Sequence, residues 1–207
     1  IVEEYGADTL RLYEMFMGPL EVSKPWNSNG VVGARKFITR VWNFFTNPEN
    51  ITEENDGTLE KVYHQTVKKV TSDYEQLGFN TAISQMMIFV NEVYKVGSCP
   101  KEYAEGLIKM FSCICPHVGE EIWAKLGHDN TIAYEKWPEF DEAKTVESTV
   151  EIAVQINGKT KATVMIDKDA DKDSVIAKAK EEIADKLTGN IVKEIYVPGR
   201  IVNIVMK

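Results

Sequence analysis

The residues of this sequence with the clearest chemical potential are cations in a stretch that has no acids. The chain carries 32 Asp and Glu against 24 Lys and Arg, and its formal net charge is -8. Between residues 22 and 48, however, no acidic residue occurs, and the cations are Lys24, Arg35, Lys36 and Arg40. Basic side chains interleaved with aromatic ones suit a polyanion such as RNA.

The residues around these cations predict one amphipathic helix over residues 31–45. At about 100° per residue, the polar side chains cover one face and the apolar and aromatic side chains cover the other. The polar face holds Arg35, Lys36, Thr39, Arg40 and Asn43, and the apolar face holds Phe37, Ile38, Val41, Trp42, Phe44 and Phe45. We therefore expect a cationic stripe whose back is anchored in a core.

Arg35, Lys36 and Arg40 are the first candidate RNA-binding residues. A solvated helix face explains any one of these cations as well as an RNA contact does, but the set of three in an acid-free window favours RNA. Trp26 and Trp42 are interpreted as core residues and not as platforms on which bases stack, because large aromatic side chains are usually packed.

Cys113, Cys115 and His117 are of types that bind metals, and they lie close together in the sequence. On a helix, Cys113 and His117 share one face while Cys115 points about 200° away, so only two ligands converge. No CxxC motif supplies the other ligands that zinc needs, and we predict a buried helix with small thiol side chains instead of a metal site. With Cys99, the cysteines are too few for a disulfide framework, which indicates a reducing compartment.

The charge is distributed unevenly along the chain. Residues 1–50 carry 6 acids and 5 bases, residues 51–147 carry 17 and 9, and residues 148–207 carry 9 and 10. A polyanion is therefore expected to meet the two ends and not the acidic middle. No apolar run approaches the ~20 residues of a bilayer span and no secretory signal is present, so we expect a cytoplasmic protein without membrane contact. Because the chain begins with Ile1, we expect a piece of a longer protein.

Helical periodicity predicts a bundle up to about Gly127. Predicted helices begin near residues 8, 31, 59, 80, 98 and 117, and their short connections indicate antiparallel neighbours. Asp8 is the expected N-cap of the first helix. Met86 and Met87 are interpreted as core and not as part of a cofactor site.

The period changes to two near residue 148, which predicts strands. Four strands are expected at residues 150–156, 159–166, 191–197 and 201–206, with a helix at residues 174–187. Asn157-Gly158 is a hairpin signal between the first two strands. On the second strand, Lys159, Lys161 and Thr163 are expected to share one face. The predicted fold class is therefore a mainly α helical bundle followed by a small α+β domain of ββαββ order.

Four stretches in the expected order resemble class I aminoacyl-tRNA synthetases. Residues 1–21 (IVEEYGADTLRLYEMFMGPLE) resemble the stretch just after the KMSKS signature. Residues 79–83 (FNTAI) and residues 115–123 (CPHVGEEIW), the latter followed by LG and WP, are similar to elements of the anticodon-binding-type domain. Within the class, the bacterial leucyl type is resembled by several sequence segments. These are MFMGPLE, PWN, GVVGARKF, RVW and residues 195–203 (IYVPGRIVN). The resemblance covers essentially the whole chain.

The resemblance implies a division of the chain and a role in binding tRNA. It implies a stem at residues 1–25, an anticodon-binding-type helical bundle at 26–140, a linker at 141–147 and a small tRNA-contacting α+β domain at 148–207. Its implied partners are tRNA(Leu) and the parent catalytic domain, with no DNA, and contacts mainly to phosphate and shape, since leucyl enzymes do not read the anticodon. The HIGH and KMSKS signatures and the editing domain are absent. We therefore expect no catalytic residue and no cofactor in this piece, while ATP and Mg belong to the parent leucine-tRNA ligase.

Lys159, Lys161 and Arg200 are the second set of candidate tRNA-binding residues, because they lie at or next to turns of the small domain. A solubilising role explains each lysine equally well, whereas Arg200 belongs to residues 195–203, one of the segments that resemble the leucyl type. Two alternatives stay open. One is a valyl or isoleucyl enzyme, although the first type ends in a coiled coil and the second in a cysteine-rich zinc module. The other is a protein-interaction module without an RNA role, which the acidity of residues 51–147 favours.

Overall fold

The structure is a computed structural model that describes residues 1–146, 149–167, 170–187 and 189–207. The chain divides into two compact units, Ile1–Thr145 and Val146–Lys207, which we call the N-terminal and the C-terminal unit. Each unit has a hydrophobic core of its own. Among the residues described, no helix has the length and apolar character that a membrane crossing requires.

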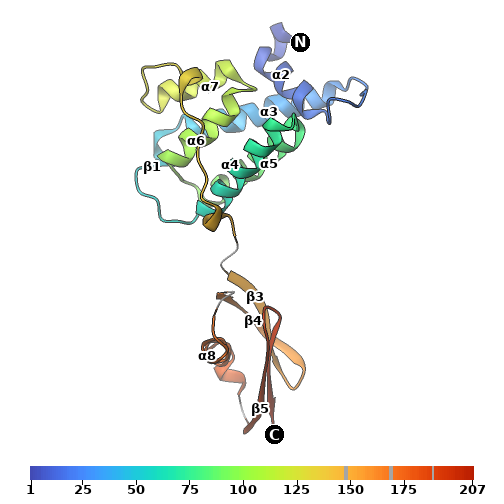
Figure 1. Ribbon diagram of the computed structural model, residues 1–207, viewed down its shortest axis with the longest axis vertical. Coiled ribbons are helices and arrows are strands. Elements are labelled where there is room, and N and C mark those ends of the chain that lie inside the picture. The colour runs from blue at the N-terminus through green and yellow to red at the C-terminus, as the bar shows by residue number, and fades with distance from the viewer. Residues whose placement is uncertain (147–148, 168–169, 188) are drawn as a thin grey trace. The chain divides into compact units, whose positions relative to one another are not determined.

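The N-terminal unit is helical, which confirms the predicted bundle (Figure 1). α4 and α5 lie side by side, and α6 packs on α7. The helices are α1 (Val2–Tyr5), α2 (Ala7–Phe16), α3 (Ser28–Phe45), α4 (Glu60–Glu75), α5 (Phe79–Val96), α6 (Lys101–Ser112) and α7 (Pro116–Lys125). Short 3₁₀ helices η1 (Pro48–Asn50), η2 (Ile132–Tyr134) and η3 (Glu142–Thr145) and the parallel strands β1 (Ile51–Thr52) and β2 (Cys99–Pro100) complete the unit.

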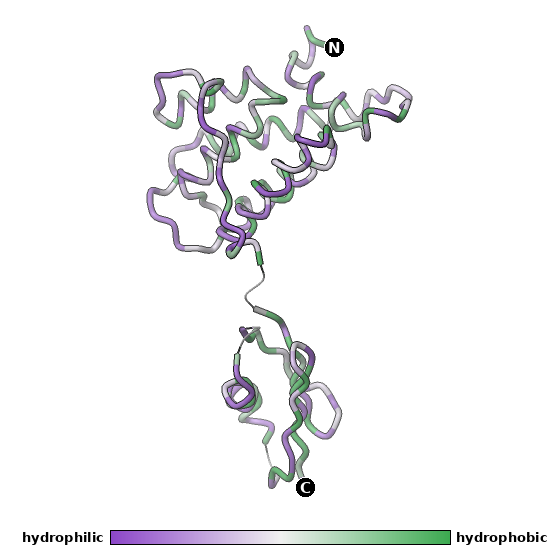
Figure 2. The backbone as a smooth tube through the Cα atoms, viewed as in Figure 1, coloured by the Kyte–Doolittle hydropathy of each residue, from purple (hydrophilic) through white to green (hydrophobic). Residues whose placement is uncertain are grey.

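The helices α2 to α7 each bury one face, and Figure 2 shows hydrophilic and hydrophobic residues alternating along them. Tyr63 of α4 stacks on Tyr103 of α6 with ring centroids 4.1 Å apart. Gly106 permits this contact, since a Cβ there would lie 2.0 Å from the Tyr63 hydroxyl oxygen. Met86 is fully buried and Met87 packs against the same core, as predicted. The apolar stripes of these helices therefore form the core of the unit.

We predicted that Asp8 caps the helix in which it lies, but the structure shows that it caps α7. It lies inside α2 and is 5% exposed. Its carboxylate accepts a hydrogen bond from the Val118 backbone N–H (2.7 Å) and contacts Nδ1 of His117 (2.8 Å). A carboxylate at a helix N-terminus satisfies free N–H groups and complements the helix dipole. The first residues of the chain are thereby tied to the last helix of the bundle.

The prediction that Cys113 and Cys115 lie in a buried helix is wrong, whereas the predicted start of a new helix near residue 117 is confirmed. α6 ends at Ser112 and α7 begins at Pro116, so Cys113 and Cys115 lie in the connection. Cys115 is buried, but Cys113 is exposed. In the described part of the chain no three His, Cys, Asp or Glu residues converge as metal ligands would.

Trp26 is also placed differently from our prediction. It is 48% exposed, contacts Tyr13 edge-on at 4.9 Å and donates its indole N–H to Ser28 Oγ (3.2 Å). It therefore covers the start of α3 instead of filling the core.

Residues 141–145, predicted as part of the linker, lie against α4, and we call them the strap. The His64 ring accepts the Asp141 backbone N–H at Nδ1 (3.1 Å). Further contacts join Gln65 to the Thr145 carbonyl (2.8 Å), Lys144 to Glu60 (2.7 Å), and Lys68 to Glu142.

The C-terminal unit is a four-stranded sheet in the order β4-β3-β6-β5, with one helix packed on it (Figure 1). β3 and β6 are parallel and the other pairs are antiparallel. Its elements are β3 (Thr149–Ile156), β4 (Lys159–Asp167), α8 (Lys172–Glu182), the 3₁₀ helix η4 (Ala184–Lys186), β5 (Ile191–Val197) and β6 (Ile201–Met206). Val175, Ile176 and Ala179 of α8 meet the buried strand residues in the core. The smaller part is thus α+β, as predicted.

Candidate nucleic-acid interface

α3 begins at Ser28, directly after its N-cap residue Asn27. The side chain of Asn27 accepts the Asn29 backbone N–H (3.0 Å), and the helix therefore starts three residues before the predicted Val31. Its apolar face enters the core, and its opposite face leaves Arg35, Lys36 and Arg40 exposed. The prediction of one helix with a buried face and a cationic face is confirmed.

The cations of α3 have no acidic partner within the described chain. The Arg35 guanidinium donates to the backbone carbonyl of Tyr5 (Nη1 to O, 3.4 Å). The Arg40 guanidinium lies over the ring of Tyr94 of α5, 4.7 Å from its centroid, and Tyr94 donates its hydroxyl to the Arg40 carbonyl (2.9 Å). These contacts orient the two side chains without neutralising their charges.

Lys125 joins this surface from α7, although sequence reasoning assigned it to the acidic middle of the chain. Its Nζ lies 5.6 Å from the ring centroid of Trp42, which is half-buried on α3. Helical angles within one element carry no signal for such a contact, because it depends on how α7 packs on α3. We call Arg35, Lys36, Arg40 and Lys125 the α3 cation set.

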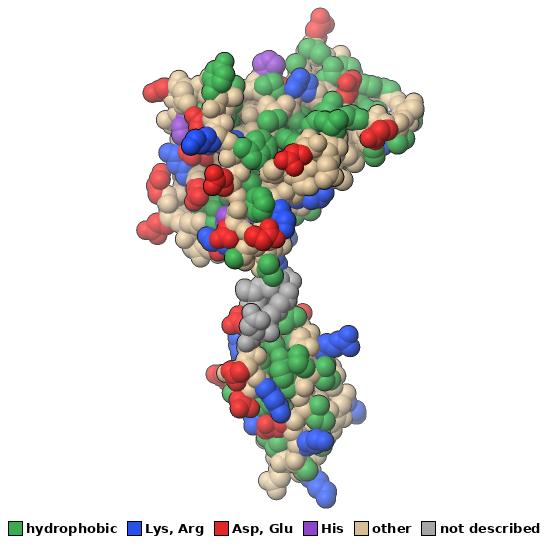
Figure 3. All heavy atoms as spheres, viewed as in Figure 1, with side chains coloured by type: hydrophobic (Ala, Val, Ile, Leu, Met, Phe, Trp, Pro, Cys, Tyr) green, Lys and Arg blue, Asp and Glu red, His purple; other side chains and the backbone are tan. Residues whose placement is uncertain are grey.

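Some other lysines are paired with acids. The pairs are Lys68–Glu142, Lys69–Asp73, Lys95–Glu92, Lys109–Glu135, Lys144–Glu60 and Lys180–Glu194. A cation that already faces a carboxylate offers less attraction to a phosphate. The face of the N-terminal unit shown in Figure 3 accordingly mixes acidic and basic side chains. The α3 cation set differs from these lysines because its charge is uncompensated.

In the C-terminal unit, a β-bulge separates Lys159 from Lys161. Val154 pairs with Ala162 and Gln155 with Thr160, so Lys161 is the extra residue of β4. Lys159 pairs with the core residue Ile156 and leaves the sheet on the face that α8 covers. The prediction that Lys159 shares a face with Thr163 is therefore wrong, because a one-residue bulge reverses the alternation.

Arg200 lies in the turn between β5 and β6, next to Gly199, whose φ of 67° favours glycine. Its carbonyl accepts the Ala153 N–H (3.1 Å), and its side chain is exposed. The β3–β4 turn with Lys159 and Lys161 begins three residues further along β3, about 10 Å away. The three cations of this unit thus stand at two separate turns.

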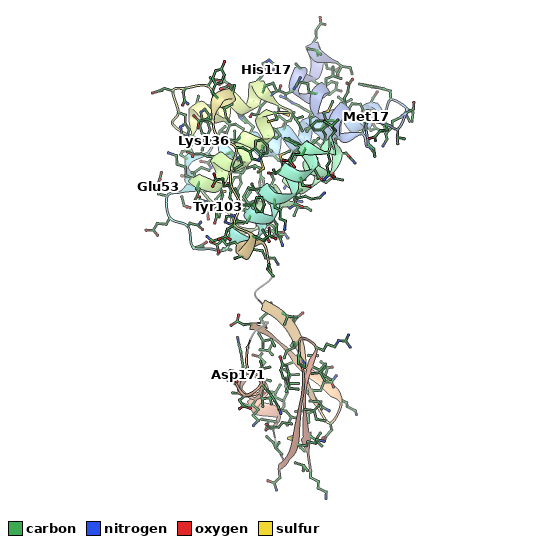
Figure 4. All side chains as sticks on the ribbon, viewed as in Figure 1. Met17, Glu53, Tyr103, His117, Lys136 and Asp171 are labelled. Atoms are coloured by element: carbon green, nitrogen blue, oxygen red, sulfur yellow. The ribbon has the colours of Figure 1, made fainter. Side chains whose placement is uncertain are left out.

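His117, His128, Cys99 and Cys115 are engaged in contacts or burial within the N-terminal unit. His117 lies where α7 meets α2 (Figure 4) and binds Asp8, while His128 stacks on Trp123 and contacts Glu105 (2.7 Å). Burial raises the pKa of the Cys99 thiol to about 12, so this thiol stays protonated and is a poor nucleophile. Burial likewise raises the pKa of Cys115.

Residues 56–177 match the model of the family described as the anticodon-binding domain of tRNA ligase. The chain belongs to this family. The match begins after α3 and continues into the C-terminal unit. The expected resemblance to class I synthetases is thereby confirmed for the bundle.

A solved structure extends the similarity to the whole chain. It is the agnB2 LeuRS of Agrobacterium radiobacter, crystallised as a ternary LeuRS–tRNA–LeuAMS complex. The two are 28% identical, with a TM-score of 0.67, and the similarity covers 100% of this chain. The chain spans 29% of the length of that synthetase. Arg35, Lys36 and Arg40 of α3 precede the residues that match the family model, whereas Lys125 lies among them. The whole α3 cation set lies within the part of the chain that is similar to the LeuRS.

Proposed function

We propose that this chain is the tRNA-binding part of a leucine-tRNA ligase. The observation that carries the proposal is the α3 cation set, four exposed positive charges without acidic partners in the described structure of a chain that belongs to the anticodon-binding family. The similarity to a LeuRS solved with tRNA supports tRNA as the polyanion and the leucyl type as the parent enzyme.

The mode of binding is docking by backbone and shape. Arg35, Lys36 and Arg40 present charge along one helix face, which follows a phosphate backbone and reads no base edges. Lys159, Lys161 and Arg200 add contacts from the C-terminal unit, to the elbow or the long variable arm of tRNA(Leu). These cations stand at two separate turns, an arrangement that suits contacts to several phosphates of a bent RNA surface better than the binding of one phosphate in a pocket.

The chemistry belongs to the rest of the enzyme. Leucine activation with ATP and Mg, and transfer to tRNA, take place in a catalytic domain outside this chain, which itself contributes no catalytic residue. The parent enzyme acts in the cytoplasm.

A filter-binding titration of the chain with tRNA(Leu) at two salt concentrations tests the proposal. Replacing Lys36→Glu and Arg40→Glu removes two phosphate contacts, so affinity falls and the slope of log K against log[salt] drops by roughly two. The matched control is Lys136→Glu with Lys178→Glu, which changes the net charge equally on other exposed segments. An unchanged affinity and slope for the α3 variant, or an equal loss in the control, contradicts the proposal.

A further inference from the structure

A hollow lies between α3 and α7, beside the α3 cation set. Its volume is about 320 Å³, and Arg35, Ile38, Thr39, Trp42 and Val118 line it. This volume is at the lower end of the range for small-ligand sites, roughly 300–1,000 Å³. Its walls are largely apolar, and a cation stands at its rim.

Trp42 offers both an aromatic surface and a hydrogen-bond donor here. The side chain packs against the bundle core yet is only half-buried. Its indole N–H has no hydrogen-bond partner among the residues that the structure describes. This differs from Trp26 and Trp137, whose indole N–H groups donate to Ser28 and Thr71.

We propose that this hollow binds one unpaired nucleobase of an RNA strand, stacked on Trp42. The inference rests on the proposed function and adds a base contact to the phosphate contacts. A base is flat and aromatic, so it fills an apolar slot against an indole, and its ring and carbonyl acceptors suit the free N–H. The phosphates on either side of the base meet Arg35 and Lys125.

Lys125 already occupies the position that such a strand requires. Its ammonium lies 5.6 Å from the Trp42 centroid, where a cation is attracted by the ring. The flexible stem of lysine lets this charge move to a phosphate when a base takes its place over the ring.

The charges around the hollow favour a nucleic acid over a peptide. Arg35 lines the hollow, and Lys125 lies near it because its Nζ is 5.6 Å from the Trp42 ring centroid. The acids nearby are Glu121, four residues before Lys125 on the same helix face, and Asp8, whose carboxylate is already engaged by the Val118 N–H. An apolar peptide side chain fills the slot but leaves the two cations uncompensated. An RNA strand satisfies both the slot and the charges.

The test compares Trp42→Leu with Trp42→Phe in the 207-residue chain, using tRNA(Leu) transcript as the probe at several salt concentrations. Leucine keeps the apolar volume but removes the stacking surface, so we expect the affinity to fall about tenfold while the salt slope stays unchanged. Phenylalanine keeps an aromatic face, so we expect a loss of no more than about threefold. Trp137→Leu is the matched control and is expected to bind like the wild type. Circular dichroism and thermal melting of each variant identify any that fails to fold. If Trp42→Leu does not fold, tRNA-induced quenching of tryptophan fluorescence is compared between the wild type and Trp42→Phe, and equal quenching in the two overturns the base site.

The outcomes separate this inference from the proposed function. If Lys36→Glu with Arg40→Glu weakens binding while folded Trp42→Leu binds tRNA like the wild type, the base site is overturned and the tRNA-docking function stands. If neither variant changes binding, both fail. Lys125→Gln is expected to lower the salt slope by roughly 0.7, as for one contact to a single strand, and an unchanged slope removes Lys125 from the site.

Discussion

α3 and α4 are amphipathic helices of the same unit, with 18 and 16 residues, and both carry cations on their outer faces. On α4, Lys68 and Lys69 are paired with Glu142 and Asp73. On α3, Arg35 and Arg40 contact only a carbonyl and an aromatic ring in the described structure, and Lys36 contacts neither an acid nor a ring there. The same residue types therefore serve stability on one helix and remain available to an external anion on the other.

The difference arises from what packs beside each helix. The strap brings Glu142 to Lys68 of α4, and Asp73 of α4 itself pairs with Lys69. α3 is flanked instead by Tyr94 of α5 and by Lys125 at the α7 junction. Composition already separates the two helices in part, because α3 lies in a stretch without acids whereas α4 contains Asp73. The pairing of Lys68 depends on Glu142, which is distant in sequence.

The largest expected effect comes from deleting the C-terminal unit. This deletion tests whether the cations of α3 bind tRNA without help from the C-terminal unit. Deleting residues 148–207 from a synthetase that carries this chain removes a second tRNA contact, and loss of such bivalency lowers affinity by about 100-fold. We expect tRNA charging to fall accordingly while leucine activation, measured by pyrophosphate exchange, is retained. An equal loss of both activities shows a folding role and removes the C-terminal unit from the comparison.

Asp8 provides a contrast to the cations of α3, because its charge is already bound by His117 and by the Val118 N–H within the protein. Asp8→Ala leaves the start of α7 uncapped, so we expect a loss of about 1–2 kcal/mol and a melting temperature lower by roughly 2–8 °C. Asp8→Asn keeps an acceptor for the Val118 N–H and is expected to lose less. Affinity for tRNA, measured on the folded variants, is expected to stay unchanged. A drop in affinity without a change in melting would place Asp8 with the RNA-binding residues.

Lys68→Glu tests the α4 side of the comparison. It replaces an exposed ion pair to the strap by a repulsion, and such pairs contribute about 0.2–1 kcal/mol. We expect a melting temperature lower by about 1–4 °C and tRNA affinity within about twofold of the wild type. If this variant weakens tRNA binding as strongly as the α3 double variant, the two faces do not differ and the comparison is broken.

The smallest effect is the pH dependence of the strap. Burial of His64, and then the positive charge of Lys144, hold the pKa of His64 below its ordinary value of 6.5. The neutral ring accepts the Asp141 N–H, so the contribution of His64 to stability is present above about pH 6.5 and is lost as the pH falls through the lowered pKa.

Thermal melting between about pH 7 and pH 5 measures this loss. His64→Gln supplies an acceptor that does not titrate, so it is expected to reduce the dependence on pH in this range. Glu60, Glu102 and Asp141 also face His64, and they oppose the lowering of its pKa. The same dependence in the wild type and in His64→Gln assigns the effect to other groups.

Local pattern predicted much of the fold. The strands Ile191–Val197 and Ile201–Met206 have the predicted bounds, because alternation over six or seven residues is decisive. Asn157 and Gly158 both adopt positive φ, at 48° and 78°, as the hairpin signal requires. The bulge at Lys161 was not predicted, since its cause lies in the pairing with β3 and not in β4 itself.

The sequence by itself determined the helical and strand periods, the family, and the cationic face of α3, because each depends on residue types at short spacing. Only the tertiary structure decided that Asp8 caps α7, that Glu142 of the strap pairs with Lys68, and that Lys125 joins Trp42 beside Arg35. These contacts link residues that are far apart in the chain. Their energies depend on distance in space and on burial, which no local pattern encodes.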